Sequence, residues 1–212
     1  MKKLFAIALV ALAFGLPQQA SSLDRQRFPI LSPDQLTSEQ KKWADEIAAP
    51  PRNAKFTNPP YNIYLRSPEL AARATAMSDY LRWKSSLPSR LSEFAILITA
   101  RQWTQQYEWH QHYPLAIKGG LDPKILADMI VGKRPSEMKE DETILYEFAT
   151  QLYRDKNVSD ATFDAAVAKL GERSVMDLIG ILGYYDLVSM TLIAAKSEPP
   201  QDDIPRLQPF PK

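Results

Sequence analysis

The sequence contains no cysteine among its 212 residues. Disulfides, thiol nucleophiles and iron–sulfur ligation are therefore excluded, because each of them needs a cysteine sulfur. One-sided charge is also lacking, with 26 Lys and Arg against 25 Asp and Glu, and no basic run is longer than two residues. Because nucleic-acid-binding surfaces concentrate positive charge, we expect no nucleic-acid partner.

Strand signals are missing as well, since no segment alternates convincingly between polar and apolar residues and no Asn-Gly hairpin is present. No proline interrupts the chain between Ser136 and Glu198, which permits long helices there. The apolar residues elsewhere recur at helical spacing. The sequence therefore predicts an all-α fold, with helices near 38–48, 68–84, 88–104, 106–118, 123–131, 137–156, 160–170 and 175–195.

Helix ends and proline positions outline the organisation of the chain. Thr37 with Gln40, and Ser174 with Asp177, have the spacing of N-terminal capping boxes. Proline-rich composition predicts an extended arm before the first helix, a loop after it and an extended C-terminal tail. These segments are 21–36, 49–60 and 197–212, and they bound one helical domain over 23–196.

The N-terminus has the composition of a secretory signal peptide over residues 1–22. Lys2 and Lys3 precede an apolar run over 4–16, and small residues follow at 20–22. We expect export to the periplasm or the exterior, with cleavage after Ala20 or Ser22 and no membrane association afterwards. The alternative is an N-terminal membrane anchor, although the apolar run is short for a bilayer.

Residues suited to acid–base chemistry gather in one part of the sequence. Both histidines lie within three positions, and His112 follows Glu108 by four residues, which places these two on one helix face. Glu93 is the single acid in the apolar stretch 91–100, and Arg101 follows on roughly the same side of the helix. From spacing alone, the residues are also consistent with structural roles. Glu108 and His112 would then form an ordinary surface contact, and Glu93 and Arg101 a structural ion pair.

Aromatic residues flank Glu108, with Tyr107 before it and Trp109 after it. They are candidates for lining a substrate site. They are also consistent with an ordinary hydrophobic core, because aromatic side chains dominate core packing.

These residues belong to a longer pattern that resembles the carboxymuconolactone decarboxylase family, which includes the AhpD-like alkylhydroperoxidases. The resemblance covers roughly residues 55–132. Its elements are Leu87-Pro88, Arg90-Leu91-Ser92-Glu93, Thr99-Ala100-Arg101, Tyr107-Glu108-Trp109, His112, Ala116 and Gly119-Gly120-Leu121. It implies an AhpD-like helical bundle. The peroxidase branch carries two cysteines that fall here on Gln105 and Glu108, so its thiol chemistry is unavailable to this chain.

The resemblance to the decarboxylase branch implies a lyase or isomerase that needs no cofactor and acts on a small carboxylated or lactone-like substrate. Glu93, Glu108 and His112 would be the catalytic acid–base set, and His112 would shuttle the proton. Arg101 would hold a substrate carboxylate, with Tyr107 and Trp109 beside it. Two alternatives stay open: a metal-dependent enzyme using Glu93, Glu108 and His112, and a non-catalytic exported protein that binds a ligand.

The resemblance also implies a homo-oligomer, a trimer or a multiple of one. The predicted helix 175–195 supports this because it is apolar on nearly every side, which suits a central or an interface helix. Gly180 and Gly183 give that helix a surface that a second helix could approach closely.

Overall fold

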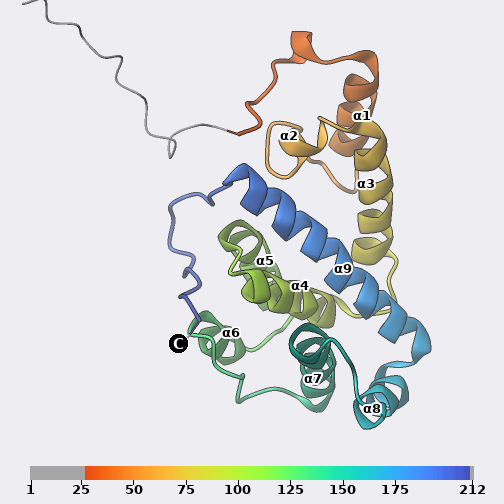
Figure 1. The fold of residues 1–212 in the computed structure, drawn as a ribbon, viewed down its shortest axis with the longest axis vertical. Helices are drawn as coiled ribbons and strands as arrows, with labels where there is room; N and C mark the ends of the chain where they lie inside the picture. The colour runs from red at the N-terminus through yellow and green to blue at the C-terminus, as the bar shows by residue number, and fades with distance from the viewer. Residues whose placement is uncertain (1–26, 211–212) are drawn as a thin grey trace, which may run out of the picture.

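The computed structural model describes residues 27–210, so the predicted signal peptide lies outside the described residues and export stays a prediction. Within that part of the chain every regular element is helical, as predicted (Figure 1). A short 3-10 turn, Pro33–Gln35, comes first. The α-helices are α1 (Ser38–Ala48), α2 (Tyr61–Tyr64), α3 (Pro68–Trp83), α4 (Ser89–Trp103), α5 (Gln106–Lys118), α6 (Pro123–Ile130), α7 (Glu140–Asp155), α8 (Asp160–Leu170) and α9 (Glu172–Ala195).

Of the two predicted capping boxes, one is confirmed and one is wrong. Thr37 caps α1 in a capping box with Gln40, as predicted. The predicted box of Ser174 with Asp177 is wrong, because α9 begins at Glu172 after Gly171, which has φ 86°. Both polar residues therefore lie inside the helix. Asp177 accepts hydrogen bonds from Tyr80 of α3 and from Ser86 in the segment between α3 and α4, and these bonds tie α9 to both.

Two short elements were missed, and two helix starts, those of α7 and α9, were each misplaced by three residues. The four-residue helix α2 follows the proline-rich loop, and the 3-10 turn interrupts the arm that was predicted to be extended. Both are too short to produce a helical period in the sequence. The helix predicted from residue 137 begins only at Glu140, where Glu142 completes the N-terminal cap.

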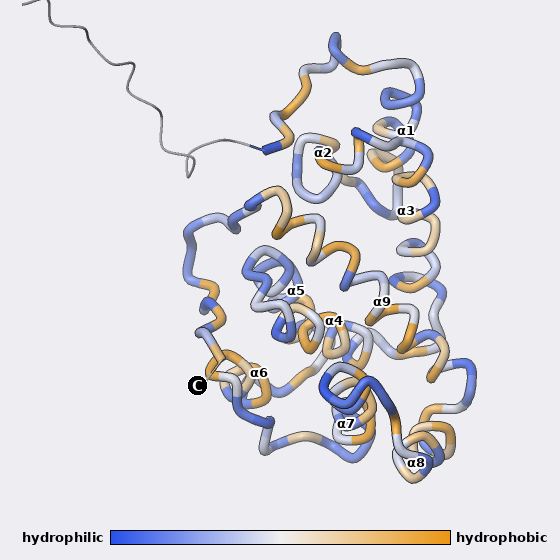
Figure 2. The backbone as a smooth tube through the Cα atoms, in the orientation of Figure 1, coloured by the Kyte–Doolittle hydropathy of each residue, from blue (hydrophilic) through white to orange (hydrophobic). Residues whose placement is uncertain are grey.

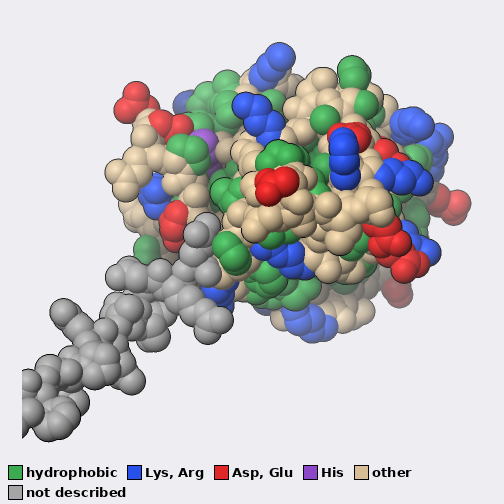
Figure 3. Space-filling view, turned by 90° about the horizontal axis from the view of Figure 1, so that it is seen from above, with side chains coloured by type: hydrophobic (Ala, Val, Ile, Leu, Met, Phe, Trp, Pro, Cys, Tyr) green, Lys and Arg blue, Asp and Glu red, His purple; other side chains and the backbone are tan. Residues whose placement is uncertain are grey.

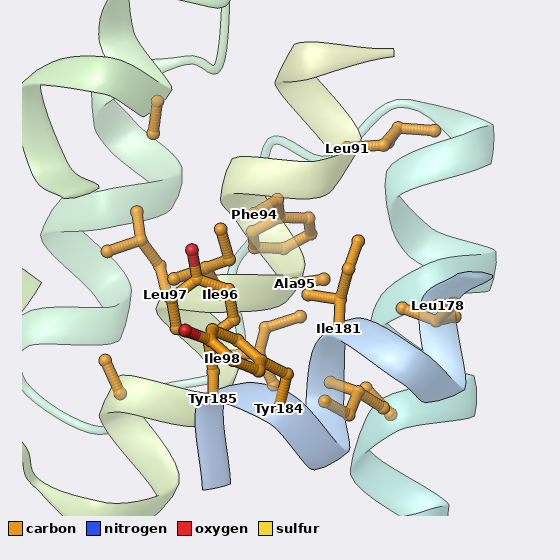
Figure 4. Packing of buried hydrophobic residues seen from close by; sticks show 14 of the residues in the cluster. Leu91, Phe94, Ala95, Ile96, Leu97, Ile98, Leu178, Ile181, Tyr184 and Tyr185 are labelled. Atoms are coloured by element: carbon orange, nitrogen blue, oxygen red, sulfur yellow. The ribbon is translucent and has the colours of Figure 1, made fainter. Parts of the chain in front are cut away.

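The core forms around α4, which makes its most extensive contacts with α5 and α9. Figure 4 shows Phe94 of α4 opposite Ile181 of α9, with Tyr184 and Tyr185 of α9 beside Ile98. Phe94 and Leu97 are completely buried. Because α4 is buried on most sides, any polar group it carries must find a partner inside the protein.

Helix α9 is the longest described helix and runs across the middle of the molecule (Figure 1). By length and mean hydropathy, 1.7, it could cross a membrane, and 50% of its most apolar window is buried in the protein. In Figure 2, apolar residues recur along the whole length of this helix. Its outer side carries exposed apolar residues, namely Met176, Ile179, Met190 and Ile193.

The C-terminal tail is extended, as predicted, and lies across helices of its own chain (Figure 1). Gln106 exchanges two hydrogen bonds with the backbone of Leu207, at 2.8 and 3.0 Å. Trp109 donates its indole hydrogen to the Pro205 carbonyl. Leu207 is only 4% exposed, so the tail contributes to the core.

Charged side chains of both signs alternate over the face of the molecule drawn in Figure 3. That face presents no broad region of one sign. The even distribution agrees with the near-zero net charge of the sequence.

We expect the protein to form a homo-oligomer through the exposed apolar side of α9. A fully buried apolar side chain contributes about 1.5–3 kcal/mol, so Met176→Lys with Met190→Lys should shift the assembly strongly toward monomer. Light scattering at micromolar concentration measures this, with circular dichroism confirming that the variant is folded. A wild-type mass equal to one mature chain would contradict the expectation.

Candidate functional site

His112 lies between two carboxylates in the interior of the protein. Its Nδ1 atom is 2.6 Å from Oε2 of Glu93, and its Nε2 atom is 3.5 Å from Oε2 of Glu108. All three residues are buried, with exposed fractions of 8% for Glu93 and 4% for each of the others. The structure thus brings together the three residues that were predicted as the acid–base set.

The connection between α4 and α5 produces this convergence. Thr104 ends α4 in the left-handed conformation, with φ 49°, and turns the chain within two residues. Gln105 then caps α5 by accepting a hydrogen bond from the Tyr107 amide at 2.6 Å. The two helices pack side by side, so Glu93 near the start of α4 faces His112 on α5.

The hydrogen bond to Glu93 determines which ring nitrogen of His112 carries the proton. An ionised carboxylate can only accept, so Nδ1 is the donor in this bond when Glu93 is ionised. The second nitrogen, Nε2, is then the one that gains or loses a proton, and it faces Glu108. Oε2 of Glu108 has no hydrogen-bond partner among the described residues. An unpaired buried carboxylate oxygen is costly and is poised to take up a proton.

Burial raises the pKa of Glu108 above its ordinary value. The burial effect is the largest, His112 and Arg82 act in the opposite direction, and the charge of Glu93 adds to the rise. The interior therefore favours the neutral acid at this position.

Aromatic side chains of α9 surround the third side of His112. The Tyr185 ring meets the imidazole edge to face, with the ring centroids 5.1 Å apart, and Tyr184 packs against Tyr185 in the same way. Burial raises the pKa of Tyr184 to about 12 and that of Tyr185 well above its usual value. Both phenols therefore stay neutral and confine the ring without competing for its proton. These contacts could not be predicted from the sequence, because α9 is distant from α5 along the chain.

Glu93 also borders a cavity of about 380 Å³, which lies between α3 and the adjoining ends of α4 and α5. Small-molecule sites commonly have volumes of 300–1,000 Å³. Two exposed cations, Arg82 and Lys118, line the same cavity. Sequence reasoning missed both, because neither belongs to a motif. Glu93 is the member of the buried set that borders this cavity, so His112 and Glu108 lie behind it.

The predicted substrate-binding residues lie elsewhere. Arg101 is directed at the tail and donates to the Gln208 carbonyl at 2.6 Å, and it borders a different cavity. Trp109 is 1% exposed and holds the tail through Pro205. Tyr107 is half-buried against the core. None of the three lines the Glu93 cavity.

The geometry also bears on the metal alternative. Among residues 27–210, no group of three or more His, Asp and Glu side chains is arranged to hold a metal ion. Glu93 and Glu108 contact opposite nitrogens of the same imidazole. A single ion would need both carboxylates and one nitrogen to point at one place, which this arrangement does not provide.

Comparison with known proteins gives the fold. No protein-family model matches the chain, and no curated protein matches it either. An uncharacterized peroxidase-related protein from Silicibacter sp. TM1040 superposes with a TM-score of 0.64 at 17% identity, over 88% of this chain and 95% of that one. A protein of unknown function from Agrobacterium tumefaciens, described as a putative antioxidant defence protein AhpD, gives a TM-score of 0.56 at 18% identity, over 66% of this chain and 97% of that one.

These similarities define an AhpD-like helical fold for this chain. They do not extend to thiol chemistry, because the sequence has no cysteine. At the two positions where the resemblance aligns cysteines, Gln105 caps a helix and Glu108 faces His112.

The raised pKa of Glu108 predicts a pH-dependent effect of Glu108→Gln. An acid whose folded pKa is raised contributes stability that is complete below its unfolded pKa and is lost as pH rises through the folded pKa. Near pH 4 the variant should match the wild type. Toward pH 8 the variant should have a larger free energy of unfolding than the wild type. The difference should be about 1.4 kcal/mol for each unit by which folding raises the pKa of Glu108.

Urea denaturation at several pH values measures this difference. Glu137→Gln makes the same chemical change at an exposed position and should give a difference that does not vary with pH. A constant offset for Glu108→Gln between pH 4 and pH 8 would show that the interior does not favour the neutral acid.

Proposed function

We propose that this protein is a cofactor-free lyase or isomerase that acts on a small carboxylated or lactone-like molecule by general acid–base chemistry. The observation that carries the proposal is the position of Glu93. Its carboxylate is hydrogen-bonded to buried His112 and also borders a cavity flanked by Arg82 and Lys118. Glu93 therefore connects the buried acid–base pair with a cavity whose two cations would attract a carboxylate.

In this proposal Glu93 is the catalytic residue that exchanges a proton with the substrate, and His112 is a positioning residue that acts through it. When the substrate loses carbon dioxide, its carbon–carbon bond breaks and the electron pair moves to the neighbouring carbonyl oxygen as an enolate. Arg82 and Lys118 would stabilise that negative oxygen. The Glu93–His112 pair would then deliver a proton to carbon, and solvent would replace it. In an isomerisation the same pair would remove the proton and return it elsewhere.

Glu108 would set the electrostatic surroundings of His112. Burial raises the pKa of Glu108, so the interior favours its neutral form, and Nε2 of His112 then faces an uncharged group. A neutral Glu108 places no second negative charge against the ring, which supports the role of the Glu93–His112 pair in moving the proton.

The proposal predicts turnover of carboxylated unsaturated lactones by the purified protein, with loss of activity in Glu93→Gln. General acid–base groups contribute about 10²–10⁴-fold, so kcat/KM should fall by at least 100-fold. Lys118→Gln should lower kcat, because it removes a charge that stabilises the enolate, whereas Lys124→Gln, an exposed lysine on α6, should change neither constant. Carbon dioxide release, and proton NMR in D2O for isomerisation, measure the reaction.

Two results would count against this function. If Glu93→Gln and wild type turned over the same substrate equally, Glu93 would not be the acid–base residue. If no substrate of this class were converted or showed proton exchange, while the cavity still bound carboxylates, the protein would be a ligand-binding protein.

A further inference from the structure

Arg101 carries a buried guanidinium that forms no ion pair with an acid among residues 27–210. It is 6% exposed. Its Nη1 atom donates to backbone carbonyls of Gln208, at 2.6 Å, and of Ile130, at 3.5 Å. Within residues 27–210 its Nε and Nη2 atoms have no hydrogen-bond partner, although both are buried. Arginine does not lose its proton in proteins, so this charge persists.

The aromatic ring of Phe210 covers the face of this guanidinium, with the ring centroid 3.9 Å from Cζ of Arg101. A cation over an aromatic ring gains part of the stabilisation that it loses on leaving water. One face and one edge of the group are thus occupied. The remaining edge, formed by Nε and Nη2, has the paired donors that bind a carboxylate through two parallel hydrogen bonds.

Arg101 borders a cavity of about 110 Å³ between α4, α7 and the tail. Lys133 and Arg154 line it too, whereas no Asp or Glu of the described part of the chain does. Arg154 is paired with Asp155, but Lys133 makes no ion pair among the described residues. The rest of the lining includes hydroxyl groups and apolar side chains, notably Ile98 and Met129. This cavity shares no lining residue with the one beside Glu93.

We propose that this cavity is a binding site for a short-chain monocarboxylate, whose carboxylate pairs with the Nε/Nη2 edge of Arg101. The positive lining without an acid selects an anion. The small volume restricts it to a few non-hydrogen atoms, and Ile98, Met129 and the Phe210 ring accommodate a short hydrocarbon chain rather than a second charge. Lys133, at the exposed side, adds a weaker attraction. This site is independent of the proposed reaction at Glu93.

NMR of the arginine Nε–H groups tests the proposal on the full mature protein. Titration with propionate at constant ionic strength should shift one Nε–H signal saturably, and that signal should be absent in Arg101→Lys. Arg101→Lys should weaken propionate binding at least tenfold by calorimetry, because lysine cannot make the two parallel bonds. Lys133→Gln should weaken it two- to fivefold, and it remains informative if Arg101→Lys does not fold.

The controls separate this site from general anion binding and from the Glu93 cavity. Propanol and chloride should leave the signal unchanged, and Glu93→Gln and Lys124→Gln should bind propionate as the wild type does. Absence of a saturable shift, or loss of binding in Glu93→Gln, would overturn the proposal. Inorganic phosphate binding as tightly as propionate would overturn the assignment to a monocarboxylate.

Discussion

The hydrogen bond between Glu93 and His112 is the interaction on which the site depends. It connects α4 to α5 inside the protein, where each group alone would carry a large desolvation cost. Removing either partner would leave the other buried and unpaired, so the bond also fixes how the two helices lie against each other. It orients the imidazole, leaving one nitrogen toward Glu108. The chemistry and the packing of this region are therefore set by the same contact.

The two cavities use positive charge differently. Beside Glu93, the cations Arg82 and Lys118 are exposed, and the carboxylate that borders them belongs to the protein itself. Around Arg101, the cation is buried and no acid among the residues that the structure describes lines the space. The first arrangement suits a substrate that enters, reacts and leaves, because exposed charges attract it without holding it strongly. The second suits a ligand that replaces water around a fixed guanidinium.

The sequence predicted the helical architecture well, because proline, glycine and capping residues mark helix ends locally. The set Glu93, Glu108 and His112 was implied by the family resemblance, whereas spacing alone left these residues open to a structural role; the structure brings the three side chains together. Arg82 and Tyr185 could not be found in this way, because their proximity to the set depends on how α3 and α9 pack. The substrate role predicted for Arg101 also depended on tertiary packing. Helical spacing placed Arg101 on the side of Glu93, whereas in the structure its side chain donates a hydrogen bond to Gln208 in the tail.

The protonation of the His112 ring tests the account most directly. The protein has two histidines, so the variant His110→Asn assigns the ring signals in long-range proton–nitrogen NMR spectra. If Nδ1 donates to Glu93 and Nε2 exchanges the proton, neutral His112 must carry its hydrogen on Nδ1. A neutral ring with hydrogen on Nε2 and a bare Nδ1 would contradict the account, because the Glu93–His112 bond could then not orient the imidazole for proton transfer.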